Sequence, residues 1–137
     1  NKFGQYLRSE YESEFIRFAG PVYNIETLNC LRYFSNLYFH GHSVGGTNPS
    51  LLEAMASGAL IVAHDNVFNK SVLANDAFYF SSAAEIAVII DGPITKSDCA
   101  AMLKNNRDRI TNEYSWQKIT TSLENYLVES LKKDKKR

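Results

Sequence analysis

Apolar residues along the chain fall into two patterns, short runs of strand length and stretches with a helical spacing of three or four residues. The runs at 15–19, 36–40, 60–63 and 78–80 have the length of strands. The run from Leu60 to Ala63 is apolar throughout, which is typical of a strand buried on both faces of a parallel sheet. The sequence therefore predicts four strands, at Phe15–Ala19, Asn36–His40, Leu60–Ala63 and Phe78–Phe80.

The stretches between these runs carry helical signals. Asn24 can cap a helix that runs to Phe34, and Asn48 can cap one that begins at Pro49 and ends before Gly58. Further helices are predicted at 2–11, around 70–73, at 83–90, at 97–113 and at 115–131. The last of these has an apolar stripe of Trp116, Ile119, Leu123, Tyr126, Leu127 and Leu131.

Strands and helices alternate throughout, which indicates βαβ units. The predicted fold class is α/β, with a Rossmann-like parallel sheet covered by helices on both faces. The 137 residues suit one domain, and the 45% hydrophobic content can fill its core. The chain starts at Asn1 without a methionine and with a helix already under way, so we expect residues 1–137 to be an N-terminally incomplete domain.

Composition narrows the function classes. Fifteen basic and fifteen acidic residues balance, which argues against a nucleic-acid partner. Cys30 and Cys99 are far apart and have no metal-ligand spacing, so we expect reduced thiols in a cytoplasmic protein and no metal site. The basic tail 132–137 leaves two interpretations open. It is either a frayed helix end that complements the helix dipole, which we favour, or a peripheral contact with anionic lipid.

The loop between His40 and Pro49 has the parts of an anion site. Gly45 and Gly46 allow a ligand to approach the backbone closely, and the following helix offers its positive end. A pyrophosphate would find donors in the amides of Gly46, Thr47, Ser50 and Leu51 and in the hydroxyls of Thr47 and Ser50. The same glycines also occur in an ordinary strand-to-helix turn, so this pattern alone leaves both interpretations open.

Glu53 lies one helical turn inside the start of that helix, among apolar neighbours. A carboxylate in such surroundings needs hydrogen-bond donors. It can be a structural residue satisfied by local N–H groups, or it can accept sugar hydroxyls. Its position alone favours the structural role.

The stretch Ser50-Leu51-Leu52-Glu53-Ala54-Met55-Ala56-Ser57-Gly58 and the strand after it resemble the retaining glycosyltransferases of family 4. The resemblance extends to Phe18–Val22, to the helix start at Ile25–Leu28 and to Tyr114–Trp116, in the order usual for that family. It therefore covers most of the chain, and its central motif is the most specific part. The loop from His40 to Pro49 also resembles that of a rhamnosyltransferase-like subgroup.

This resemblance implies the C-terminal, nucleotide-sugar-binding domain of a GT-B enzyme. Glu53 would hold the ribose, with Gly46, Thr47 and Asn48 near the diphosphate and Ser50 beside them. Replacing Glu53 is then expected to weaken donor binding and to leave the fold intact. The family usually has a second glutamate eight positions earlier, where this chain has Gly45. His42 either replaces that donor-sugar contact or is a structural loop histidine.

Other candidates follow the next predicted strand. Lys70 keeps a positive charge in a loop that resembles one of related enzymes; it either approaches the diphosphate or is a solvated helix-start lysine, which we slightly favour. His64 opens this second loop and is an undecided candidate, whereas His40 is expected to be structural. The sequence identifies no catalytic residue.

The resemblance implies an enzyme that transfers a sugar from a nucleotide-diphosphate donor to a saccharide or lipid-linked acceptor, with no further cofactor. Surface polysaccharide or glycolipid assembly would be its pathway. An acceptor-binding N-terminal domain would precede Asn1, so the chain alone is expected to be inactive. Two strands of the sheet would be missing as well, which leads us to expect self-association through open sheet edges. The alternatives are a GT-B sugar-nucleotide epimerase and a non-catalytic α/β nucleotide-binding module.

Overall fold

The computed structural model describes residues 1–134; the last three residues of the basic tail, 135–137, lie outside the described part. The helices are α1 (Lys2–Tyr11), α2 (Ile25–Phe34), α3 (Pro49–Ala56), α4 (Val67–Leu73), α5 (Ala83–Asp91), α6 (Ala100–Glu113) and α7 (Trp116–Asp134). The strands are β1 (Tyr38–His40), β2 (Ile61–His64) and β3 (Phe78–Phe80). The chain is thus α/β, as its alternating pattern predicts.

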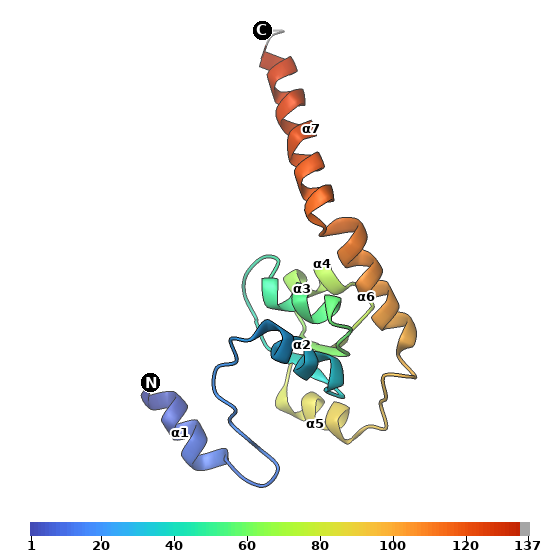
Figure 1. Cartoon of the computed structure of the whole chain (residues 1–137). Coiled ribbons are helices and arrows are strands. Elements are labelled where there is room, and N and C mark those ends of the chain that lie inside the picture. Colours follow the sequence, from blue (N-terminus) through green and yellow to red (C-terminus); the bar gives the residue numbers. More distant parts are fainter. Residues whose placement is uncertain (135–137) are drawn as a thin grey trace.

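The three strands form one parallel sheet in the order β1-β2-β3 (Figure 1). Tyr38 lies opposite Ile61, and Val62 lies opposite Phe78. Each parallel pair needs a crossover, which α3 and α4 provide. The arrangement is a Rossmann-like parallel sheet, and it brings the carboxyl ends of β1 and β2 to one edge, next to the first turns of α3 and α4.

The core lies on one face of this sheet. Its members come from α3, β2, α4 and the turns that lead into β2 and β3: Leu51, Ala54, Met55, Ala59, Ile61, Ala63, Val72, Leu73 and Ala77. Ile110 and Tyr114, from α6 and its end, pack against this cluster. Helix α3 is therefore enclosed between the sheet and α6, which fixes the helix whose first turns carry the candidate site.

The opposite face of the sheet is less fully covered than the sequence predicts. Side chains alternate along a strand, so Phe39, Val62 and Phe78 lie on this second face. Val62 is fully buried there, but Phe39 keeps 39% of its surface exposed. Complete helical layers on both faces are thus not observed within residues 1–134.

The predicted strand at Phe15–Ala19 is wrong. This segment has no regular secondary structure, and Phe15 is 87% exposed. One contact that holds it is the guanidinium of Arg8, which donates to the carbonyl oxygen of Phe18 at 3.2 Å. A strand requires the backbone of a neighbouring strand, and an apolar run cannot show whether such a neighbour is present.

Helix ends follow the predicted local signals closely. Asn24, Asn48 and Ser82 cap α2, α3 and α5 with their side chains. Gly58 follows the end of α3 with φ +70°, a conformation that L-residues with a side chain rarely adopt. These signals act over three or four residues, which is why the sequence locates them.

Helices α1 and α7 extend away from the sheet at the two ends of the chain (Figure 1). Trp116, Leu123 and Tyr126 of the predicted α7 stripe are all more than half exposed. The stripe is thus helical as predicted but uncovered by the rest of the described chain. Among the described helices, none is both long and apolar enough to cross a membrane.

Candidate functional site

The loop between β1 and α3 is held by two asparagines, Asn66 at the N-cap of α4 and Asn69 in the first turn of α4. The side-chain amides of Asn66 and Asn69 both donate to the carbonyl oxygen of His42, at 3.0 and 3.1 Å. The amide of Asn69 also donates to the carbonyl oxygen of His64 at 2.9 Å, and Asn69 is buried. These bonds connect the loops that follow β1 and β2, so the first loop has a defined shape.

A small hollow of about 160 Å³ lies against this loop. It is lined by His42, Val44, Gly45, Gly46, Thr47, Asn48, Pro49, Phe68 and Asn69. Five of the predicted site residues therefore meet at one place. Gly45 has φ +123°, a value that a residue with a side chain adopts only under strain, whereas the φ of Gly46 is not positive. The backbone freedom of the Gly-Gly pair is thus needed at its first member.

Fewer backbone amides are free here than the sequence suggests. The side-chain oxygen of Asn48 already accepts from both the amide and the hydroxyl of Ser50, at 3.0 and 2.8 Å. The amide of Leu51 donates to the carbonyl oxygen of Asn48 at 3.0 Å. Of the four amides that the sequence proposes as donors, those of Gly46 and Thr47 make no hydrogen bond within residues 1–134, so they remain available to an anion.

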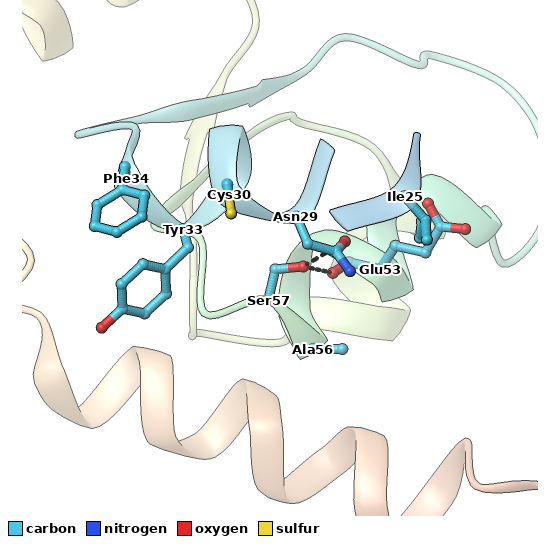
Figure 2. Close-up of a pocket in the computed structure, with 8 residues that line it drawn as sticks. All are labelled: Ile25, Asn29, Cys30, Tyr33, Phe34, Glu53, Ala56 and Ser57. Atoms are coloured by element: carbon cyan, nitrogen blue, oxygen red, sulfur yellow. Dashed lines mark hydrogen bonds between the residues drawn. The ribbon is translucent and has the colours of Figure 1, made fainter. Parts of the chain in front are cut away.

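Glu53 lines a second and larger hollow, a groove of about 620 Å³ between α2 and α3 (Figure 2). The other lining residues are Ile25, Asn29, Cys30, Tyr33, Phe34, Ala56 and Ser57. The Glu53 carboxylate lies at the end of this groove that is marked by Ile25. Its side chain is 46% exposed, so a ligand in the groove can reach it.

The donor that Glu53 requires is Arg32 of α2. Its guanidinium Nη2 lies 2.7 Å from Oε2 of Glu53, and its side chain is only 5% exposed. The other terminal nitrogen donates to Oδ1 of Asn29 at 3.3 Å. Ser57 donates to the same Asn29 oxygen at 3.1 Å and to the carbonyl oxygen of Glu53 at 2.7 Å. A polar network thus joins α2 to α3 around one half-exposed carboxylate.

The smaller hollow lies at the N-terminal end of α3 and the larger one along Glu53, Ala56 and Ser57, and the two share none of their lining residues. Glu53 is four residues beyond Pro49, a rise of about 6 Å along the helix. Glu53 thus lies about one helical turn from the end of α3 into which the glycine loop leads.

The histidines occupy different surroundings. His40 is buried at the end of β1, and burial, together with the neighbouring His42, lowers its pKa. The rings of His40 and His42 stack with centroids 4.6 Å apart, and His42 is exposed in the loop hollow. His64 lies at the end of β2, where its Nδ1 is 3.4 Å from the Asn66 amide. Only His42 of the three lines the hollow.

Lys70 lies away from the glycine loop. Its ammonium group is 2.7 Å from a carboxylate oxygen of Asp65 and stands over the ring of Tyr79. Burial, and after it the nearby Asp65, raises the pKa of Tyr79 to about 12. In this arrangement the charge of Lys70 is neutralised by Asp65, and Lys70 does not line the loop hollow.

Two residues that shape the site are absent from the sequence-based prediction, Arg32 and Asn69. Arg32 is a charged residue among the apolar positions of α2, a pattern that signals a paired buried charge. Asn69 lies three residues after Asn66, which is the spacing at which a cap side chain accepts from a backbone amide. This spacing identifies Asn66 as the cap of α4, but it does not show that the side chain of Asn69 also binds the loop. In the described residues, no group of three or more His, Cys, Asp or Glu is placed to hold a metal ion.

Comparisons of the chain with protein-family models, with curated proteins and with solved structures gave no match. The assignment of a function therefore depends on the geometry of this site and on the motif at Ser50–Ala63.

Proposed function

We propose that the chain binds the nucleoside diphosphate of an activated sugar, as the donor-binding domain of a retaining glycosyltransferase. Glu53 accepts the ribose hydroxyls, and the loop at Gly45–Thr47 takes the diphosphate. The observation that carries the proposal is Glu53 itself. It is a half-exposed carboxylate, held by a buried arginine, one turn inside a helix whose preceding loop offers free amides.

The chemistry of the loop supports the diphosphate assignment. Two free amides and the positive end of α3 point to an anion rather than to a neutral group. Gly45 and Gly46 would each place a Cβ in open space, with no protein atom within 4 Å, so the backbone is accessible from outside. His42 lines the same hollow and can meet either the diphosphate or the sugar.

In transfer, negative charge develops on the departing diphosphate. Fixed amide dipoles aimed at that charge stabilise the transition state more than the ground state. The acceptor, a saccharide or a lipid-linked saccharide, would bind to another domain. We therefore expect this chain to bind the donor without turning it over. A rhamnosyl group is one of the donor sugars to test, because the His40–Pro49 loop resembles that of the rhamnosyltransferase-like subgroup.

Calorimetry with uridine, guanosine, adenosine and thymidine diphosphates tests the proposal. We expect one of these to bind the native chain, and Glu53→Gln to bind it about tenfold or more weakly, as for a lost hydrogen bond to a charged group. Asp108→Asn is a matched control, because Asp108 lies in an exposed ion pair on α6. If none of the four binds, or if Glu53→Gln binds as the native chain does, the proposed ribose contact is wrong.

A further inference from the structure

The ion pair of Glu53 is arranged asymmetrically. Arg32 contacts Oε2 alone, at 2.7 Å, and no other side chain in residues 1–134 hydrogen-bonds to this carboxylate. Oε1 is thus left for a ligand. A carboxylate on a free helix surface would rotate among several staggered conformations, and each would aim this oxygen differently.

Arg32 itself has little freedom. Only 5% of its side chain is exposed. Asn29 holds one of its terminal nitrogens and Glu53 the other. A planar guanidinium held at two points fixes the direction of its N–H groups, which a flexible ammonium does not. The direction of the Glu53 carboxylate is therefore set from α2 and not by α3 alone.

A contribution to stability alone does not account for the arrangement of the Arg32–Glu53 ion pair. A buried ion pair is a weak source of stability, because both charges lose hydration. Here the arginine is buried while the glutamate remains 46% exposed, and the glutamate lines the groove between α2 and α3. An arginine that served only to join two helices would not need its partner at a groove.

We propose that Arg32 is the positioning residue of the nucleotide site, which orients Glu53 so that its free oxygen accepts ribose hydroxyls. This inference depends on the proposed nucleotide function. Arg32 determines discrimination for ribose and not the affinity for phosphate. It does not contact the ligand.

The test compares two ligands on one protein. Calorimetry measures the affinity for the tightest of the four nucleoside diphosphates and for its 2′,3′-dideoxy counterpart. The native chain should prefer the hydroxylated ligand. Arg32→Met should lower affinity for that ligand about tenfold, equivalent to one displaced charged hydrogen bond, and should leave affinity for the dideoxy ligand unchanged. Arg32→Lys, which keeps the charge, should retain part of the discrimination.

Arg109→Met is the matched control, because Arg109 is also a mostly buried arginine paired with a carboxylate, that of Asp76 at 3.1 Å. It should leave the discrimination as in the native chain. Circular dichroism checks that each variant is folded, and Arg32→Lys decides the question if Arg32→Met does not fold. Weaker binding of both ligands to the same degree would indicate a purely structural arginine and overturn the inference. Unchanged discrimination in Arg32→Met or, if that variant is unfolded, in Arg32→Lys also overturns it. If the native chain binds no nucleoside diphosphate, the proposed function itself fails.

Discussion

Removing Glu53 should change stability as well as binding, because the structure places a buried cation beside it. In Glu53→Ala the guanidinium of Arg32, 5% exposed, would keep only the Asn29 oxygen at 3.3 Å. Its Nε already lacks a hydrogen-bond partner in the described chain. We therefore expect Glu53→Ala to keep the fold, as the sequence predicts, but to be less stable than the native chain.

The magnitude follows from the burial of each partner. Breaking a fully buried ion pair costs about 3–5 kcal/mol. Glu53 is 46% exposed, so water can partly replace the carboxylate in the variant. A lost hydrogen bond to a charged group, about 1.5–3 kcal/mol, is then the better scale. This is a large part of the roughly 5–15 kcal/mol that stabilises a typical domain.

A double-mutant cycle measured by urea unfolding tests this reasoning. Arg32→Met added to Glu53→Ala removes the unpaired cation, so the double variant should be no less stable than Glu53→Ala. We expect a coupling energy of about 1–2 kcal/mol. The control cycle at Lys104 and Asp108, an exposed pair one turn apart on α6, should give about 0.3–0.5 kcal/mol. A coupling at Arg32 and Glu53 no larger than the control would refute the account.

Three further predictions concern the loop and the strand that leads to it. Asn69→Leu removes two buried hydrogen bonds and should lower the free energy of unfolding by about 2 kcal/mol, with faster amide hydrogen exchange in the loop after β1. Gly45→Ala should cost about 1–2 kcal/mol because of its positive φ, whereas Gly46→Ala should not; equal losses in urea unfolding would contradict this. The pKa of His40 is lower in the folded chain than in the unfolded chain. As pH falls through about 6.5, His40 is therefore protonated in the unfolded chain before it is protonated in the folded chain. Stability should thus fall below that pH, and His40→Phe should reduce the slope of unfolding free energy between pH 7 and 5.

The sequence alone determined the local features of this protein. Asn48 caps α3 through a bond to a residue two positions away, and Gly58 ends the same helix. Both signals lie within a few residues, where side-chain chemistry acts directly on the backbone. The same holds for the apolar run that becomes β2. The proposal of an anion site at the glycine loop depends on local signals of the same kind.

Tertiary structure decided which partners these elements have. Arg32 reaches Glu53 across 21 positions, and Asn69 reaches the loop carbonyl across 27. Lys70 pairs with Asp65 and does not line the hollow at the glycine loop, and Phe15–Ala19 finds no neighbouring strand among the described residues. Such pairings depend on how α2, α3 and the sheet pack together. The spacing of residues in the sequence shows which of them lie on the same face of a helix. Which charged residues pair with one another depends on which of them the folded chain buries together.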